Sequence, residues 1–368
     1  MLMARENLVQ LTSAAVLALT ATPATAMQDA DRGCATIGAI TAKVGQCADT
    51  PHGVVLAATA DRAAALAAIA AQGEVRFTRH FDRSPPKYAV IEGDGTLDPV
   101  IGDALAAAGY VWRMPWLSPD FFAERINGSL RRVVEARAKA QGLAPDAAER
   151  MIAAALAQNA SRFSPEAIAR REQGVVPHEL GHGWLMRGWW PDAPPLPEGA
   201  PRRYGGPGPD WMDELAAVLM EDEASARNRR DDFDRRLTTG SATRDRLLDL
   251  KTYLTMAHPA LAAIATSSSP EANRTTGVMV LGAEESRFAA DQGILFYLQS
   301  RLFADYLIER TGPSRAFVTA ADTFAAGGTT ADWLARHGPS LGIATDIDTL
   351  QADWRAWVIA RSASATDG

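Results

Sequence analysis

Five consecutive residues, His178-Glu179-Leu180-Gly181-His182, have the types and spacing that metal chemistry requires. Residues four positions apart lie on one face of a helix, about 5–6 Å apart at Cβ, so both imidazoles can reach the same ion. Neutral imidazole is a good ligand for Zn²⁺. Glu179 lies beside the two ligands and can take a proton from the attacking water without displacing either of them. The motif therefore predicts two metal ligands and a general base.

The residues that flank this motif predict a buried helix. Val175-Val176 precede it and Trp184-Leu185-Met186 follow it. Titratable side chains that face an apolar interior need a partner that compensates their burial, and a bound metal cation is such a partner. Pro177 directly precedes the motif and has no backbone N–H, so the helix either begins near Pro177 or is kinked there.

A catalytic zinc site needs a third protein ligand and one open position. A metzincin would carry glycine at 185 and histidine at 188, whereas this chain has Leu185 and Gly188. The acidic segment Pro209–Ala217 offers a carboxylate instead, on a helix that can cross the first one. Glu214 is the candidate ligand. Asp213 is the alternative, because acids near a helix N-terminus are favoured in any case.

The two segments together, H-E-L-G-H and P-D-W-M-D-E-L-A-A, resemble the gluzincin clan of zinc metallopeptidases, the peptidase MA-like family. The resemblance covers about residues 165–360. It implies that His178, His182 and Glu214 bind zinc and that Glu179 is the catalytic base. It also implies a helix over residues 293–309 in which Tyr297 stabilises the tetrahedral oxyanion.

Several residues near the expected site depart from the family pattern or leave a choice open. Leu215 replaces the usual glycine after the third ligand, and Val218 stands where an aspartate would orient an imidazole. His258 is a rival to Tyr297 as the electrophile. Trp184, Trp189, Trp190 and Trp211 either pack in the core or line a substrate cleft. The candidates for orienting the imidazoles are Asp213, Glu221 and Asp222.

The residues before the motif predict a small N-terminal α/β module over 27–116. Apolar runs predict strands at 54–59, 74–80, 87–91 and 110–114, and helical periodicity predicts helices at 61–72 and 97–108, the first with Asp61 as its N-cap. This order is that of a ferredoxin-like βαββαβ unit. The module would act as a prosegment, a substrate-docking domain or a scaffold.

Residues 117–368 predict a mostly helical region, which the resemblance implies is a zincin-type catalytic domain. Helices are expected at 121–141, 146–159, 211–226, 292–310 and 348–361, with a further helix that begins at Ser164-Pro165-Glu166 and leads into the metal motif. The Pro/Gly-rich stretch Pro191–Pro209 predicts a loop. Arg229–Arg236 mixes both charge signs and is interpreted as a solvated helix face. The predicted fold class is therefore α+β.

The first 26 residues predict a secretory signal peptide. Arg5 precedes an apolar stretch over residues 8–19, and small residues stand at Ala24 and Ala26 before the expected cleavage point. The apolar stretch is shorter than the ~20 residues of a membrane span. Export would place Cys34 and Cys47 in an oxidising compartment, periplasmic or extracellular, which favours a disulfide over two free thiols.

The composition of the chain argues against further classes of protein. The 368 residues carry a net charge of −7 and are 47% hydrophobic, which excludes general disorder and argues against nucleic acid as a partner. The prediction is an exported zinc peptidase that acts on peptides or proteins, with endopeptidase favoured because the aminopeptidase G-x-M-E-N signature is missing. The alternatives are a catalytically silent envelope binding protein and a latent protease inhibited by its N-terminal module.

Overall fold

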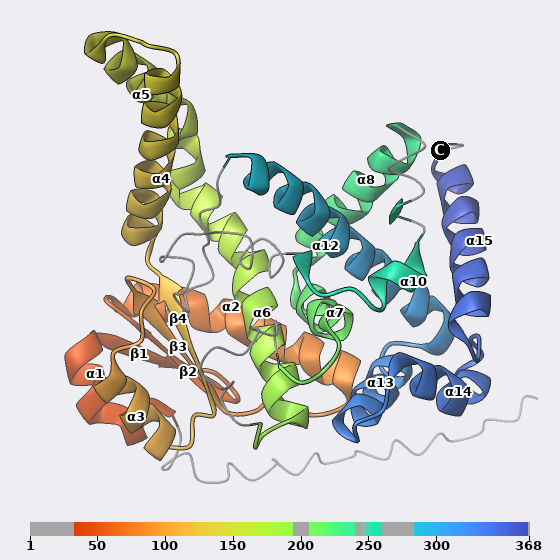
Figure 1. Ribbon diagram of the computed structural model, residues 1–368. Coiled ribbons are helices and arrows are strands. Elements are labelled where there is room, and N and C mark those ends of the chain that lie inside the picture. Colours follow the sequence, from red (N-terminus) through yellow and green to blue (C-terminus); the bar gives the residue numbers. More distant parts are fainter. Residues whose placement is uncertain (1–32, 194–205, 240–245, 248, 260–282, 367–368) are drawn as a thin grey trace, which may run out of the picture.

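The computed structural model describes residues 33–193, 206–239, 246–247, 249–259 and 283–366. A four-stranded sheet with its helices forms the N-terminal part, and a larger helical region follows it (Figure 1). This confirms the α+β class. The signal peptide predicted for residues 1–26 and most of the loop predicted for 191–209 lie outside the described residues.

The sheet has the order β1-β2-β3-β4. The strands are β1 (Gln46–Asp49), β2 (Gly53–Ala57), β3 (Tyr88–Gly93) and β4 (Trp112–Leu117). β1 is antiparallel to β2, while β2, β3 and β4 are parallel to one another. Helix α2 (Ala60–Phe81) connects β2 to β3, and α3 (Pro99–Ala107) connects β3 to β4. The module is therefore a βαβαβ unit with one antiparallel edge strand.

The predicted ferredoxin-like order was wrong because the strand expected at 74–80 is the second half of α2. Gly73 does not end this helix. The buried face that begins at Leu66 continues at a helical spacing of three to four residues through Ala70, Gly73, Phe77 and Phe81. Burial against the helical region therefore overrides the local preference for a strand. The N-cap of α2 is Thr59, two residues before the expected Asp61.

The segment before β2 contains the predicted disulfide. The 3₁₀ helix η2 (Gly33–Ile37) leads into α1 (Gly38–Val44), and Cys34 at its start is bonded to Cys47 on β1. The Cys34 backbone N–H donates to Asp49, at a distance of 2.8 Å, which holds the same two segments together. An intramolecular disulfide indicates a non-reducing compartment.

The helical region begins directly after β4. Its elements are α4 (Pro119–Ala140), α5 (Pro145–Asn159), η3 (Ala160–Phe163), α6 (Pro165–Trp189), α7 (Asp210–Met220), α8 (Glu223–Thr239), α10 (Leu250–Tyr253), α12 (Ala283–Thr311), α13 (Arg315–Ala325), α14 (Thr330–Leu341) and α15 (Ile347–Thr366). The hairpin of α4 and α5 projects from the body of the molecule (Figure 1). The single helix predicted over 211–226 is two helices, because the chain turns at Glu221 and Asp222 caps α8 by accepting the Ser225 N–H.

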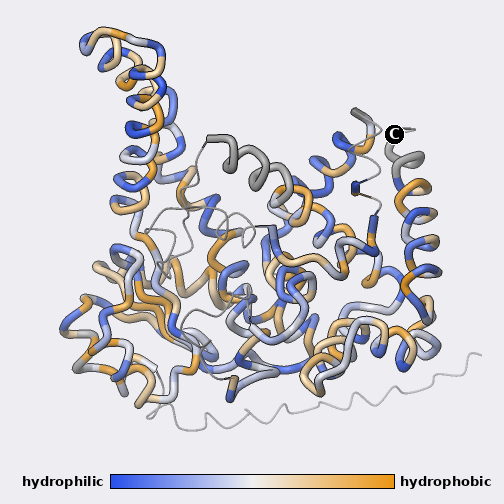
Figure 2. The backbone as a smooth tube through the Cα atoms, in the orientation of Figure 1, coloured by the Kyte–Doolittle hydropathy of each residue, from blue (hydrophilic) through white to orange (hydrophobic). Residues whose placement is uncertain are grey.

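One face of the sheet shares a hydrophobic core with the helical region, and the opposite face packs against α1 and α3 in a second, smaller cluster. Helix α2 lies between the strands and α6, and the space at Gly73 is filled by Pro177 and Trp184 of α6. Figure 2 shows the strands as a largely hydrophobic layer at the left of the molecule, beside these helices. Ion pairs also connect the sheet with the helical region, because Arg62 of α2 pairs with the buried carboxylates of Glu92 on β3 and Glu172 on α6. The α/β layer therefore supports the helix that carries the metal motif.

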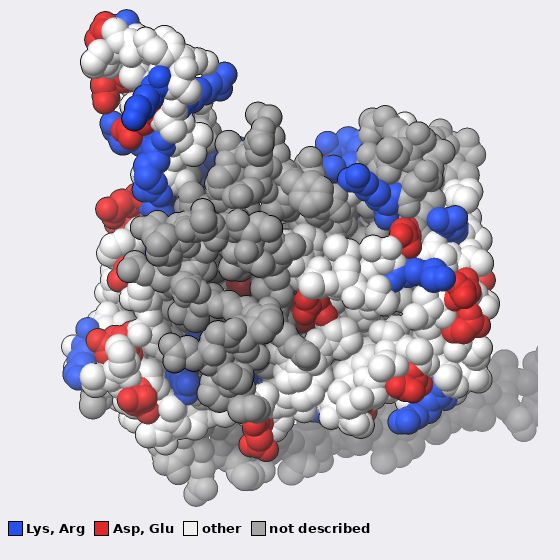
Figure 3. All heavy atoms as spheres, viewed as in Figure 1, with Lys and Arg blue, Asp and Glu red and all other residues white. Residues whose placement is uncertain are grey.

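The described surface carries charges of both signs. On the face shown in Figure 3, acidic and basic side chains are interspersed, and neither sign forms a continuous patch over the described residues. Among those residues, no helix combines the length and the hydropathy that crossing a bilayer requires.

Candidate metal centre

Helix α6 presents both histidines of the motif from one continuous helix. It begins at Pro165, where Ser164 caps it by accepting the Ala167 N–H, and it runs through Pro177 to Trp189. The sequence left open whether the helix begins near Pro177 or is kinked there. The helix begins twelve residues earlier, so the first alternative is wrong. The rings of His178 and His182 lie on the same face with their centroids 5.0 Å apart.

Helix α7 crosses α6 at very close range, and Gly181 makes this approach possible. A Cβ at position 181 would lie 2.9 Å from Ala217 Cα and 3.1 Å from the backbone oxygen of Ala216, closer than side-chain atoms tolerate. The missing side chain lets the backbone of α7 rest on α6 directly beside His182. Glu214, slightly less than one turn before Ala217, consequently faces the two imidazoles.

His178, His182 and Glu214 form a buried group that can hold a metal ion. One ligand atom from each lies within 4.8 Å of the others. His178 Nε2 is 3.6 Å from Glu214 Oε1, and His182 Nε2 is 3.9 Å from Glu214 Oε2. A tetrahedral zinc ion holds its nitrogen and oxygen ligands about 3.3–3.4 Å apart, given bonds of about 2.0–2.1 Å. The two separations, one to each oxygen of Glu214, exceed this spacing by about 0.2–0.6 Å.

The environment of Glu214 supports the same interpretation. Its side chain is fully buried, and the imidazole Nε2 atoms of His258, His178 and His182 lie 3.5–3.9 Å from its carboxylate oxygens. A buried carboxylate in this state is costly unless a cation or several donors compensate it. The nearby imidazoles lower the pKa of Glu214 despite its burial, so the carboxylate is charged and able to bind a cation.

Two further carboxylates orient the imidazoles from the other side. Glu221 Oε1 lies 2.8 Å from His178 Nδ1, and Asp213 Oδ2 lies 2.8 Å from His182 Nδ1. A carboxylate at Nδ1 favours the tautomer that carries its proton there, which directs the Nε2 lone pair toward the metal position. Asp213 therefore lies behind a ligand, while Asp222, the third candidate for this role, caps α8 instead.

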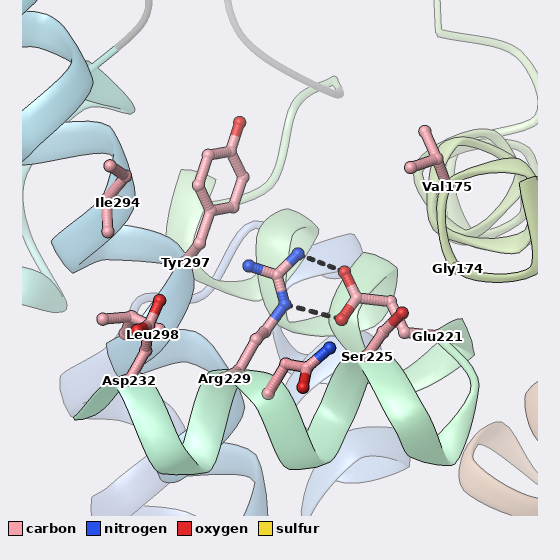
Figure 4. Close-up of a pocket in the computed structure, with 10 residues that line it drawn as sticks. Gly174, Val175, Glu221, Ser225, Arg229, Asp232, Ile294, Tyr297 and Leu298 are labelled. Carbon is pink, nitrogen blue, oxygen red and sulfur yellow. Dashed lines mark hydrogen bonds and ion pairs between the residues drawn. The ribbon is translucent and has the colours of Figure 1, made fainter. Parts of the chain in front are cut away.

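Arg229 holds Glu221 in place. Its Nε lies 2.6 Å from Glu221 Oε2, and one of its terminal nitrogens bonds Oε1 of the same carboxylate, so two parallel hydrogen bonds join the groups (Figure 4). Burial alone would raise the pKa of Glu221, but the hydrogen bonds from Arg229 and His178 outweigh it and lower the pKa to about 2. The carboxylate behind His178 is thus always charged near neutral pH.

Protons and metal ions compete for this site. Burial opposes a charge on both imidazoles, yet the surrounding carboxylates raise the pKa of His178 and raise that of His182 to about 10. Among the carboxylates near His182, Asp213 raises its pKa the most. The acids therefore stabilise a positive charge between them, which either protons or a metal ion can supply.

The remaining predicted residues surround the cluster on different sides. Glu179 is partly exposed, and its charge contributes to the raised pKa of His182. Tyr297 of α12 is also partly exposed, with its ring centroid 6.0 Å from that of His178. His258 is fully buried, and its Nε2 lies 3.5 Å from Glu214 Oε2. Tyr297 therefore lies at an accessible side of the cluster, whereas His258 backs the third ligand.

The tryptophans near the motif pack in the core. Trp184 meets Phe77 and Tyr88 edge-on, with ring centroids 5.6 and 5.2 Å away. Trp189 and Trp211 are buried as well, and their indole N–H groups donate to Asp322 and Thr330. Trp190 is only partly buried.

Two functional residues were missed by the sequence analysis. Arg229 was assigned to a solvated face, but it faces inward and bonds Glu221. Gly181 was treated as a spacer, although its position decides how closely the two helices cross. An acid eight residues before an arginine is a weak signal, because the contact depends on the turn between α7 and α8.

Comparison of this chain with protein-family models, with curated proteins and with solved structures finds no match. The assignment of function therefore depends on the geometry of the site.

Proposed function

We propose that this protein is an exported zinc-dependent endopeptidase. The observation that carries the proposal is the buried group of His178, His182 and Glu214, in which each imidazole is backed by its own carboxylate. Two imidazoles and one carboxylate are the ligand set of a catalytic rather than a structural zinc site, because a fourth position remains for water or substrate. The HExxH motif supplies the general base at the adjacent position.

The chain's own residues then divide the work of hydrolysis. Zinc, when bound, polarises the scissile carbonyl and makes water acidic enough to react near neutral pH. Glu179 takes the proton of the attacking water and returns it to the leaving amine. Tyr297 of α12, whose ring centroid lies 6.0 Å from that of His178, donates to the developing oxyanion. His178 and His182 hold their orientation through Glu221 and Asp213.

The decisive variant is Glu179→Gln. It keeps the size of the side chain and removes the base, so zinc content should stay at one ion per chain while cleavage of a peptide library falls at least ~10²-fold. Glu166→Gln is the matched control, because Glu166 lies in the first turn of the same helix and is exposed. Elemental analysis gives the zinc content, and mass spectrometry of the peptides gives the cleavage.

Two results would contradict the proposal in different ways. Cleavage by Glu179→Gln at the wild-type rate would exclude Glu179 as the base. Weak or absent zinc binding, together with no cleavage of any peptide by the wild type, would instead favour the catalytically silent binding protein. A shortened chain that lacks the α/β layer tests the latent protease, and we expect loss of activity rather than a gain, since that layer packs against α6.

A further inference from the structure

One row of side chains on helix α6 stays accessible along the middle of the helix. Between residues 171 and 185, the α6 positions that are not buried are Arg171, Gln173, Val175 and Glu179. Arg171, Val175 and Glu179 are spaced four residues apart, so they form one row along the helix. A peptide whose scissile bond lies beside Glu179 can follow this row, which leads from the general base to Arg171.

The guanidinium of Arg171 lies against aromatic rings at the base of the projecting hairpin of α4 and α5 (Figure 1). Its central carbon is 3.9 Å from the ring centroid of Phe122 on α4 and 5.3 Å from that of Trp116 on β4. Phe122 packs in turn on Phe163 of η3, with ring centroids 5.9 Å apart. Stacking on ring faces uses none of the five N–H donors of a guanidinium, because these lie in its plane.

Arg171 has no anionic partner among the described residues. Within that part of the chain its side chain forms neither an ion pair nor a hydrogen bond, and its close contacts are with the two rings. The adjacent acid, Glu172, is already bound, because Arg62 donates to both of its carboxylate oxygens and the Trp116 indole donates to one of them. A stacked and partly exposed arginine in this state is preorganised to bind a carboxylate.

The charges around Arg171 allow an anionic ligand. The two positive charges of Arg62 and Arg171 balance the two buried carboxylates of Glu92 and Glu172, so this group presents no net negative charge. Burial lowers the pKa of Arg171, and the charges of Glu172 and Glu179 oppose this effect. A carboxylate bound at Arg171 would therefore compensate a charge that is partly removed from water.

Building on the proposed function, we propose that Arg171 binds a carboxylate of the peptide substrate and thereby sets a preference for an acidic group at a fixed distance from the scissile bond. Arg171 and Glu179 are eight residues apart, which is about 12 Å along the helix. An extended peptide spans about 3.3–3.6 Å per residue, so the carboxylate belongs to the third or fourth residue from the scissile bond. Its source is an acidic side chain or the C-terminus of the peptide.

The test uses acetylated and amidated decapeptides of alanine, leucine and serine. One series carries a single aspartate at each position in turn, a matched series carries asparagine, and a further peptide has neither residue but a free C-terminus. Mass spectrometry locates the cleaved bond. We expect cleavage three or four residues from the aspartate to be about tenfold faster than at the same distance from asparagine. Arg171→Gln should remove this preference, whereas Arg170→Gln, an exposed change at the adjacent position, should keep it.

The peptides distinguish the two sources of the carboxylate. A preference confined to the aspartate series assigns the site to acidic side chains. Cleavage of the peptide with the free C-terminus three or four residues from its end assigns the site to the terminal carboxylate. Either result supports the inference if Arg171→Gln abolishes it.

A merely structural role for Arg171 gives a different result. If Arg171 only balances the buried acids, Arg171→Gln would lower the free energy of unfolding in urea and leave the positional preference unchanged, which would overturn the inference. Cleavage by the wild type without any preference for an acidic group would overturn it as well. If Arg171→Gln does not fold, Arg171→Lys takes its place. An ammonium has no planar set of donors, so the preference should fall severalfold, and an unchanged preference would again overturn the inference.

A binding measurement separates this inference from the proposed function. Fluorescence anisotropy compares the labelled peptides with aspartate or asparagine at the fifth position, using full-length protein from which zinc has been removed. We expect the aspartate peptide to bind about tenfold tighter to the wild type and equally well to Arg171→Gln. Equal binding of both peptides to the wild type would overturn the inference. A wild type that binds no zinc and cleaves no peptide would refute the proposed function, while this comparison would still test Arg171.

Discussion

The replacement of Gly181 by alanine tests the packing that builds the metal centre. The new Cβ would lie 2.9 Å from Ala217 Cα, whereas ordinary contacts begin near 3.4 Å, so the two helices must separate by about 0.5 Å. Alanine favours a helix over glycine by about 1 kcal/mol. Overpacking costs typically about 1–3 kcal/mol, so the net change should lower the free energy of unfolding by up to about 2 kcal/mol.

Zinc affinity should fall together with stability. Glu214 lies on α7 only three residues before Ala217, so the helix shift also moves its carboxylate away from the imidazoles. Sites of this kind tolerate displacements of only about 0.5 Å. We therefore expect zinc to bind about tenfold more weakly, comparable to the loss of a partner behind a ligand. Urea unfolding and chelator competition measure the two effects.

Gly188→Ala is the matched control on the same helix. A Cβ at position 188 would lie 3.8 Å from Pro86 Cγ, which is an ordinary contact. This variant should therefore be as stable as the wild type or up to about 1 kcal/mol more stable, with unchanged zinc affinity. If Gly181→Ala matched Gly188→Ala in both measurements, the close crossing would not be what positions Glu214.

Three further predictions concern groups around and away from the metal. Glu221→Gln should weaken zinc binding about 10- to 100-fold, while Glu223→Gln at an exposed position should not. Burial lowers the pKa of His80 to about 4, whereas the same imidazole in the unfolded chain binds its proton near pH 6.5. Acid therefore favours the unfolded chain, and the free energy of unfolding should fall by up to about 3 kcal/mol as the pH drops from 6.5 to 4. His80→Asn should remove that pH dependence in urea unfolding measured across this range, and an unchanged slope would refute the assignment. Replacing Cys34 and Cys47 by serine should lower the free energy of unfolding by roughly 3 kcal/mol, and reduction of the wild type should reproduce the loss.

The parts of the site that depend on local spacing could be predicted from the sequence. His178 and His182 share a helix face whatever the rest of the chain does, because they are four residues apart. The sequence analysis also placed Glu214 on a crossing helix, since its segment follows a long Pro/Gly-rich stretch, and the structure brings it to the imidazoles. The disulfide was predictable because Cys34 and Cys47 are the only cysteines.

The parts that depend on tertiary packing could not be predicted in the same way. The segment after Gly73 has strand-forming residues, and only its burial against α6 makes it helical. The turn at Glu221 separates α7 from α8, and this turn sends Arg229 back toward His178. No local pattern around Arg229 contains that information, because the contact joins the end of one helix to the middle of the next.

The most direct test of the metal centre is an anomalous difference map from crystals of the protein loaded with one equivalent of zinc. The proposed centre predicts a single peak about 2.0–2.2 Å from Nε2 of His178, Nε2 of His182 and a carboxylate oxygen of Glu214. Glu221 and Asp213 should remain at the Nδ1 atoms. A peak at other residues, or no peak near Glu214 at full zinc loading, would contradict the account.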